Sequence, residues 1–491
     1  MACDNFIGGS FAEDPVQNNY YTKIHFLRAF SILKSYFMKK KKLTLDVINS
    51  HAAGIDVGSR SHYVAIGQGD EDVREFGVYA EDLKELTRWL CESNITTVAM
   101  ESTGTYWQNL YAALQDGGIE VVLVNGKFTK NISGKKTDVK DCKWLQKLHT
   151  IGLLTGSFLP DQSTEQLRTY CRHRTNLIET AACATRKMQH YLRLLNLRLD
   201  VVVKDITGLT GLRIIEMICK GETDPELLSS LRHGNCKKSK EEIAKALQSN
   251  NRQDYLFGLQ QELDLYKMLQ LQMEQCDKEI AKMINAHLDK DPSKKQLRTD
   301  NKIHKRVNKN APKNMDINQL SYQYFGGIDL MAIEGVSHST VIALMSEVGL
   351  EGIKKFKSAK EFSSWLRLSP NNKISGGKVL SNKIPKGSNR LKIALRNAAN
   401  AIGNLKDTHL SNFFKRIAFR KGRTSAISAT ARKLAVIIWN MITRCIQYAP
   451  PTQYEFLDQK RKRKVLEMKK LIHKFDITPD DLGLQLNINN L

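Results

Sequence analysis

The sequence predicts an α/β domain followed by an all-α region, and three observations carry this prediction. Short apolar segments alternate with helical patterns between residues 52 and 160. Long stretches with apolar residues at three- and four-residue steps follow from residue 164. The chain has 491 residues, which is too many for one ordinary core, so we expect two or three domains.

The charge balance indicates a polyanionic partner. There are 75 Lys and Arg against 51 Asp and Glu, a net charge of +24, and nucleic acid is the most frequent partner of such chains. An anionic membrane surface is the alternative, but no apolar run of about 18 residues is present, so we expect no membrane-spanning helix. The nine cysteines form no Cys-x-x-Cys pair and the 12 histidines show no zinc-ligand spacing, which is typical of reduced, intracellular thiols.

Residues 1–50 are interpreted as an N-terminal extension. Its start is polar, and the apolar run at 25–37 is interrupted by Arg28 and Lys34, so it does not resemble a signal peptide. Four lysines follow Met38, and the next apolar residues lead directly into the first predicted strand. Our hypothesis is that Met38 is the natural start and that the first 37 residues are an upstream extension.

Residues 51–160 are predicted to form a mixed sheet with helices. Three extended segments come first, and strands then alternate with helices, an order that suits a mixed sheet. The predicted strands are 52–57, 63–67, 75–79, 97–100 and 120–124, and the predicted helices are 81–92, 105–116 and 138–151. Tyr106 and Trp107, at the start of the second helix, are expected in the core rather than stacked on nucleobases.

Four carboxylates mark a candidate metal site. Asp56 and Glu101 stand where strands end and the chain turns, and Asp138 and Asp141 share one face of a helix start. Carboxylates brought together repel each other unless cations lie between them, and oxygen-only ligands favour Mg²⁺ or Mn²⁺. Two such ions can activate a nucleophile and hold the leaving oxygen of a phosphodiester. The alternative is that each acid is an ordinary cap or turn residue.

Residues 161–289 are predicted to form a helical coiled-coil arm. Two long amphipathic stretches, 167–195 and 256–283, carry heptad-like apolar steps and are expected to pair. Two shorter helices, 211–219 and 240–248, are expected between them. The pair is either an intramolecular hairpin or an oligomerisation arm. A basic linker follows at 290–324, and its first part holds nine Lys or Arg and only two Asp.

Residues 325–450 are predicted to form a compact helical domain with a segment like a helix–hairpin–helix. Gly335 is expected to make the tight turn, and the second helix is expected to begin near Ser337, where backbone N–H groups can bind a DNA phosphate. The alternative is a plain corner between two helices. Further helices are predicted at 391–405, 412–420 and 425–448. The tail at 451–491 is strongly basic and is expected to be a solvated helix with a poorly ordered end.

Ser375 lies in a basic loop of this domain. Two glycines follow it, and they allow a ligand to approach the backbone closely. Residues 351–400 hold 12 Lys or Arg against two Glu. The loop's candidate nucleic-acid contacts are Lys373, Lys378, Lys383, Lys386 and Arg390. The Ser375 hydroxyl could attack a phosphodiester there, but the spacing alone favours a loop that only contacts phosphates.

These motifs together resemble the insertion sequence 110 family of DEDD transposases, which are related to the pilin-gene invertases. The first half carries Gly-Ile-Asp56-Val-Gly, Met-Glu101-Ser-Thr-Gly and Lys-Thr-Asp138-Val-Lys-Asp141. The second half carries Gly-Val-Ser-His-Ser-Thr, Ser375-Gly-Gly-Lys and Lys386-Gly-Ser-Asn-Arg-Leu. Ala429-Thr-Ala-Arg-Lys-Leu-Ala is similar to the family's closing helix. The resemblance extends from about residue 52 to residue 445.

The resemblance implies a fold and an activity. The N-terminal domain would be RNase H-like, of the RuvC type, and would bind Mg²⁺ through Asp56, Glu101, Asp138 and Asp141. The second half would be the family's C-terminal transposase domain, in which Ser375 is the nucleophile that becomes joined to DNA. Such a protein is a DNA transposase or recombinase of a mobile element, and we expect it in the prokaryotic cytoplasm, associated with the nucleoid.

The resemblance also implies partners. They are double-stranded donor and target DNA, a structured noncoding guide RNA from the element's flank, and further copies of the chain in a dimer or tetramer. Domains of different subunits would then form a composite site. The N-terminal extension, the long linker, the long tail and Cys142, where a small alanine is commoner, depart from the family pattern.

Two other functions stay open at this point. One is a metal-dependent RNase H-like nuclease or Holliday-junction resolvase, in which Ser375 is only structural. The other is a non-catalytic nucleic-acid-binding protein derived from a transposase.

Overall fold

The structure is a computed structural model that describes residues 46–126, 137–289, 309–313, 315–387, 389–450, 453–478 and 481. The chain divides into two compact units, a sheet unit that ends at Phe158 and a helical unit that begins at Leu159. Met38, most of the predicted linker and the last ten residues lie outside the described residues, so those predictions stay open.

The sheet unit contains one mixed five-stranded sheet. Its order is β3-β2-β1-β4-β5, in which β1, β2 and β3 pair antiparallel, whereas β4 and β5 run parallel to β1. The strands are β1 (Ala52–Val57), β2 (His62–Ala65), β3 (Val73–Phe76), β4 (Thr97–Glu101) and β5 (Glu120–Val124). The predicted mixed sheet is therefore confirmed.

The second and third strands end earlier than predicted. The second strand ends at Ala65 because the chain then turns, with the Gly69 N–H donating to the Asp72 carboxylate at 2.8 Å. The third strand ends at Phe76 instead of residue 79. Tyr79 instead caps the following helix, and its N–H donates to the Asp82 carboxylate at 3.0 Å.

Helices pack on both faces of this sheet. They are α2 (Ala80–Glu92), α3 (Trp107–Asp116) and α5 (Asp138–Thr150). Helix α5 crosses β1 so closely that a β-carbon on Gly54 would lie 2.2 Å from the Gln146 nitrogen. Because side chains alternate along a strand, Asp56 points to the α5 face, and Ile55 points to the opposite face.

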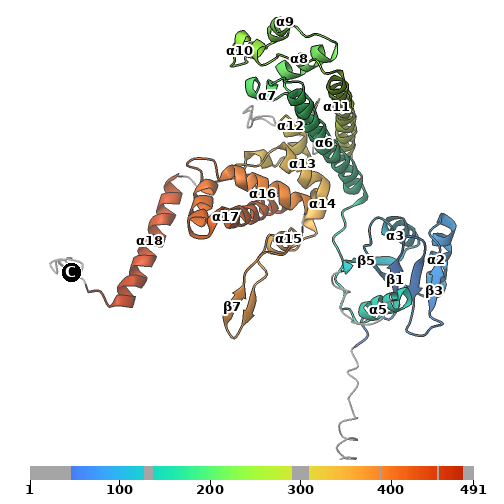
Figure 1. Cartoon of the computed structure of the whole chain (residues 1–491). Helices are drawn as coiled ribbons and strands as arrows, with labels where there is room; N and C mark the ends of the chain where they lie inside the picture. Colours follow the sequence, from blue (N-terminus) through green and yellow to red (C-terminus); the bar gives the residue numbers. More distant parts are fainter. Residues whose placement is uncertain are drawn as a thin grey trace, which may run out of the picture. The chain divides into compact units, whose positions relative to one another are not determined.

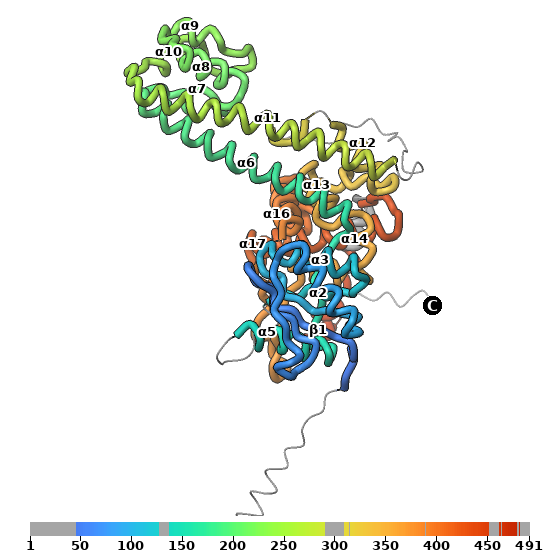
Figure 2. Tube along the Cα trace, turned by 90° about the vertical axis from the view of Figure 1, so that its right-hand side faces the viewer, coloured from blue at the N-terminus to red at the C-terminus, as the bar shows by residue number. Residues whose placement is uncertain are grey.

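The helical unit begins with the predicted arm, formed by α6 (Gln162–Leu194) and α11 (Gln253–Asp289). The two helices lie side by side in both views (Figures 1 and 2). Their facing side chains form a buried apolar stripe that includes Leu177, Met188 and Leu263. The predicted pairing is thus present within one chain, and it follows from the apolar period of both helices.

Four short helices close the far end of the arm, two more than the sequence predicted. They are α7 (Leu199–Val202), α8 (Leu209–Cys219), α9 (Pro225–Ser230) and α10 (Lys240–Lys245). Figure 1 shows them gathered beyond the ends of α6 and α11. Ile214, Leu228 and Ile243 join the apolar stripe of the arm, so the small cap and the long helices share one core.

The near end of the arm packs on the C-terminal helices. The elements that follow are α12 (Ile317–Tyr324), the 3-10 helix η2 (Leu330–Ala332), α13 (His338–Glu347), α14 (Gly349–Lys354), α15 (Ala359–Trp365), α16 (Arg390–Ile402), α17 (His409–Arg444) and α18 (Gln453–Phe475). The Arg172 guanidinium on α6 donates to the Glu347 carboxylate at 2.7 and 3.0 Å. Glu347 is buried, so this ion pair fixes the arm to α13.

The helix–hairpin–helix prediction holds only for its second half. Gly335 has a φ of +75° and Ser337 is the N-cap of α13, as expected. The element directly before the turn is the short 3-10 helix η2 and not an α-helix. Gly335 packs against α16, where an added β-carbon would lie 2.6 Å from the Ala398 carbonyl oxygen.

The gap predicted between the last two helices of this domain is present as a break within a single helix. The segments expected at 412–420 and 425–448 are parts of α17, and Gly422 interrupts its helical geometry with φ +79° and ψ 164°. In the described part of the chain, every helix is too short or too polar to cross a membrane.

Candidate active site

Asp56 and Glu101 end two neighbouring parallel strands. Ile55 of β1 lies opposite Met100 of β4, so the next residues along the two strands are the two acids. Both side chains are half-buried. A β-carbon on Gly126, just beyond β5, would lie 1.8 Å from Glu101 Oε1, so this carboxylate lies against the backbone of the neighbouring strand end.

Asp138 and Asp141 lie in the first turn of α5. The Thr137 side chain caps this helix by accepting a hydrogen bond from the Lys140 N–H at 3.3 Å. The unpaired N–H groups of a helix start favour negative charge, so both acids are compatible with their positions. The three-residue spacing puts them on one side of the helix, as predicted.

Electrostatic effects connect the first turn of α5 with the sheet. Burial raises the pKa of the Cys142 thiol to about 11, and the charge of Asp56 contributes to this shift. Tyr63 lies opposite Asp56 on β2, and a hydrogen bond with Glu75 raises its pKa, with a smaller contribution from Asp138. The first turn of α5 therefore lies beside the strands β1 and β2, on which the helix packs.

The donor set fits Mg²⁺ in its chemistry, because all four groups are carboxylates placed at one edge. In the described ranges, no group of three or more His, Cys, Asp or Glu is arranged closely enough to hold an ion. Asp56 and Glu101 are adjacent, and Asp138 and Asp141 approach from α5. An ion would require these side chains to move together.

Ser375 lies beside the turn of an exposed hairpin formed by β6 (Lys373–Ser375) and β7 (Lys378–Ser381). It pairs with Lys378, and Gly376 and Gly377 make the turn with φ values of +53° and +72°. Two positive φ values are typical of a type I′ turn. Figure 1 shows this hairpin, labelled β7, extending away from the helices. The predicted loop is therefore a β-hairpin.

The predicted cations line the hairpin and its return. Lys373 and Lys378 lie on the two strands, Lys383 and Lys386 follow β7, and Arg390 opens α16. All five are exposed. This arrangement offers several positive charges on either side of Ser375, as a phosphate backbone requires.

Two further basic residues hold the base of this hairpin, and the sequence did not distinguish them. The Arg367 guanidinium donates to the Lys386 carbonyl at 2.7 Å. The Lys392 ammonium is buried and lies 3.3 Å from the Gly387 carbonyl oxygen. Burial, followed by the charges of Arg396 and Arg367, lowers the pKa of Lys392. Within a segment so rich in lysine, nothing in the sequence marks these two as structural.

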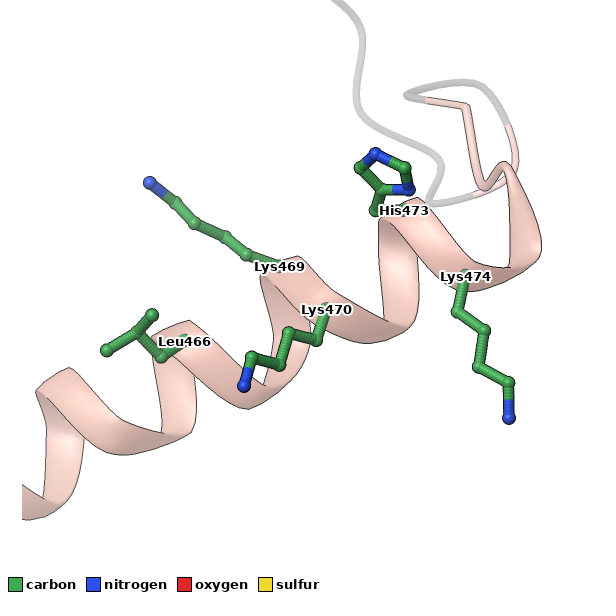
Figure 3. Close-up of a pocket in the computed structure, with 5 residues that line it drawn as sticks. All are labelled: Leu466, Lys469, Lys470, His473 and Lys474. Atoms are coloured by element: carbon green, nitrogen blue, oxygen red, sulfur yellow. The ribbon is translucent and has the colours of Figure 1, made fainter. Parts of the chain in front are cut away.

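The basic tail is helical, as expected. Lys469, Lys470, His473 and Lys474 project from α18 in different directions around the helix (Figure 3). These side chains are exposed. They form a positive helix surface and no enclosed site.

Tyr106 corrects a prediction. It was expected in the core, but its side chain is 50% exposed at the start of α3, because that helix buries Leu110 and Leu114 instead. Trp107 is half-buried and contacts the Tyr111 ring edge-on, with 5.8 Å between ring centroids.

Comparison with protein families identifies the class. A DEDD transposase model of the IS110 group, described as Transposase, matches residues 53–196. The model of the Transposase IS116/IS110/IS902 family matches residues 329–415. No curated protein matches the chain.

The mixed sheet with acids at its strand ends, the helical second half and these matches define a transposase, so DNA is its partner. The first match covers all four acids, and the second covers the hairpin of Ser375. Both matches support an IS110-family DEDD transposase. Its sheet unit is consistent with an RNase H-like domain.

Proposed function

We propose that this transposase cuts and rejoins DNA through a covalent serine intermediate. The observation that carries the proposal is the exposed position of Ser375 beside a two-glycine turn, directly opposite Lys378. Ser375 is exposed there, and the lysines of the hairpin can hold the phosphate oxygens around it.

Asp56, Glu101, Asp138 and Asp141 would hold Mg²⁺, or Mn²⁺ in its place. When bound, the ion would supply positive charge to a phosphate at the sheet edge. The role of these four residues is to bring that charge to one end of the sheet. The assignment is supported by their all-oxygen donor set and by the adjacency of Asp56 and Glu101.

The covalent step exchanges one phosphodiester for another. Ser375 Oγ forms a bond to phosphorus while the bond from phosphorus to the 3′ oxygen breaks. The hydroxyl proton is released, and the departing 3′ oxygen takes up a proton. The bond energy is kept in the phosphoserine link, so a different 3′ hydroxyl can reverse the step and join a new partner strand.

Sequence choice would come from a structured noncoding RNA encoded by the element, which pairs with donor and target DNA. The protein would then need only to contact backbones, and its net charge of +24 supports such sequence-independent binding. The working form would be a dimer or tetramer, in which the carboxylates of one subunit and the Ser375 hairpin of another form one site.

Covalent trapping tests the serine. With DNA containing the element's end and Mg²⁺, the protein should form a protein–DNA adduct that survives denaturation. Ser375→Ala should abolish the adduct and keep DNA binding. Ser381→Ala is the matched control, because Ser381 lies on the other strand of the same hairpin. An adduct formed by Ser375→Ala would overturn the assignment, and cleavage without any adduct would favour the nuclease.

Two further measurements test the other parts of the proposal. Chelation of Mg²⁺, or Asp56→Ala, should abolish cleavage with little loss of DNA binding. Cleavage by the chelated protein would reject the metal site. Sequencing of RNA that co-purifies with the protein should yield a discrete RNA that maps beside its gene. If none is enriched, the recombination is independent of a guide.

A further inference from the structure

A cavity of the sheet unit lies on the face of the sheet opposite α5. It has a volume of about 280 Å³, near the lower end for small-molecule pockets. Its lining comes from the turn after β1, from β2 and from α2 and α3. The lining residues are Gly58, Ser59, His62, Val78, Leu83, Thr105, Tyr106, Asn109 and Leu110.

His62 is the most informative residue of this lining. Its side chain is only 2% exposed, and its Nδ1 atom is buried and has no hydrogen-bond partner among the described residues. Burial lowers the pKa of His62, so the ring is neutral at pH 7 and offers one donor and one acceptor. A buried polar nitrogen without a partner is costly, so a small movement of the ring that exposed Nδ1 to a polar ligand in the adjoining cavity would gain a hydrogen bond.

The lining carries no charged side chain, although the chain has a net charge of +24. A phosphate group would require cations, so the cavity does not suit the backbone of a nucleic acid. It combines apolar side chains such as Leu110 with the amide of Asn109 and the hydroxyls of Ser59 and Thr105. Tyr106 adds a half-exposed aromatic ring. A flat, neutral ligand with polar edges fits this combination.

The cavity lies at the same end of the sheet as the carboxylates. Gly58 follows Asp56 by two residues, so their Cα atoms are within about 7 Å of each other. Thr105 follows Glu101 by four residues, which limits that separation to about 14 Å. Because the cavity opens on the other face, a strand lying across this sheet end can contact the carboxylates with its phosphate and the cavity with a nearby base.

We infer that this cavity binds a single unpaired nucleobase of the DNA or RNA strand that passes the carboxylate edge. The base stacks on Tyr106, and Asn109 and His62 hydrogen-bond with its polar edge. This inference rests on the proposed function, because that function brings a strand to this edge. Aromatic stacking and polar edge contacts are how proteins hold bases that have left a helix.

The test measures binding of the full-length protein to a short DNA duplex with one unpaired central nucleotide. That nucleotide is either thymidine or an abasic residue, and chelator is present so that no cleavage occurs. Tyr106→Ala should weaken binding of the thymidine duplex on the order of tenfold and leave binding of the abasic duplex unchanged. Tyr106→Trp should restore binding, and Asn109→Ala should weaken it selectively for the thymidine duplex.

Tyr79→Ala is the matched control, because Tyr79 is 79% exposed in the same unit and does not line the cavity. It should change neither affinity. The inference would be overturned if Tyr79→Ala and Tyr106→Ala weakened binding of the thymidine duplex equally. It would also be overturned if Tyr106→Ala weakened binding of both duplexes equally. If the unmodified protein bound neither duplex, the proposed function would be overturned as well. An adduct at Ser375 without the Tyr106 effect would leave the proposed function standing and reject the cavity.

Discussion

Gly54 of β1 and Gln146 of α5 are in direct backbone contact. A β-carbon on Gly54 would lie 2.2 Å from the Gln146 nitrogen and 2.5 Å from the Cys142 carbonyl oxygen. The Gln146 amide in turn donates to the Ala52 carbonyl at 3.3 Å. These contacts set the distance between Asp56 on the strand and the two acids at the start of the helix.

Gly54→Ala should therefore weaken both the fold and the metal site. The opposing atoms are backbone atoms of a helix and cannot rotate away, so we expect a loss of about 3 kcal/mol in the free energy of unfolding. Cleavage should fall because α5 carries Asp138 and Asp141 away from Asp56. Thermal unfolding and cleavage assays measure the two effects.

Gly156→Ala is the control for this substitution. An added β-carbon there would lie 3.5 Å from a methyl group of Val122, which is an ordinary contact. We expect stability and cleavage close to those of the unmodified protein. If Gly54→Ala were equally harmless, close packing of α5 would not position the acids.

The apolar pattern predicted the sheet and its helices because their signals are local. The segment at 52–57 is a run of apolar residues with Asp56 next to its end, and it matches β1. The pattern could not show that Gly54 contacts α5, because the contact joins residues that are far apart in sequence. His62 was missed for the same reason, since only the packed unit shows that its ring faces a cavity.

The hairpin of Ser375 was predicted as a loop, although a local signal was present. Lysine and serine are poor strand formers, and the two strands are only three and four residues long. Two successive glycines between short extended segments are, however, a recognised signal of a two-residue hairpin turn. The two glycines of the turn therefore favour the hairpin more than the residues of its strands do.

Replacement of Gly377 should separate the shape of this hairpin from its chemistry. Gly377 has a φ of +72°, and nothing lies within 4 Å of an added β-carbon, so only the backbone conformation opposes a side chain. Gly377→Val should cost about 1–2 kcal/mol locally and slow adduct formation at Ser375. The rate of adduct formation is the measurement, and DNA binding should be almost unchanged.

Gly377→Asn is the control at the same position, because asparagine tolerates the left-handed conformation. It should retain most of the rate of adduct formation. Equal rates for the valine and asparagine variants would contradict a role for the turn in placing Ser375.

Asp277 joins three segments of the helical unit. It forms a buried ion pair between α11 and Arg174 of α6, and its second oxygen accepts a hydrogen bond from the Lys313 N–H at 2.9 Å. Arg174 also donates to the Asn310 carbonyl at 2.9 Å. This part of the predicted linker is thus held against the arm.

Asp277→Ala should destabilise the helical unit by about 3–5 kcal/mol, because it leaves the Arg174 charge buried without its partner. It should also release residues 309–313 from the arm, which limited proteolysis would detect. Asp254→Ala is the control, since Asp254 pairs with Arg252 where both side chains are about half exposed. That pair should contribute less than about 1 kcal/mol. Similar effects of the two substitutions would show that the buried pair is dispensable.

His149 should make the stability of the sheet unit depend on pH. Its ring is buried on α5, with Nε2 2.9 Å from the Thr97 hydroxyl. Burial lowers the pKa of His149 below its ordinary value of 6.5, although Glu120 partly offsets this shift. The unfolded chain therefore binds a proton at a higher pH than the folded chain does.

The contribution of His149 to the free energy of unfolding should accordingly be fully present above pH 6.5. It should decrease as the pH falls toward the folded-state pKa. One such histidine contributes up to about 1.4 kcal/mol for each pH unit in that window. His149→Gln should flatten this dependence, as measured by denaturant unfolding at several pH values. His51→Gln, at an exposed position, should leave the dependence unchanged.

Since His62 is a second buried histidine in this unit, part of the slope should remain in His149→Gln and disappear when both are replaced. An unaltered slope in the double variant would show that neither ring is held neutral by burial.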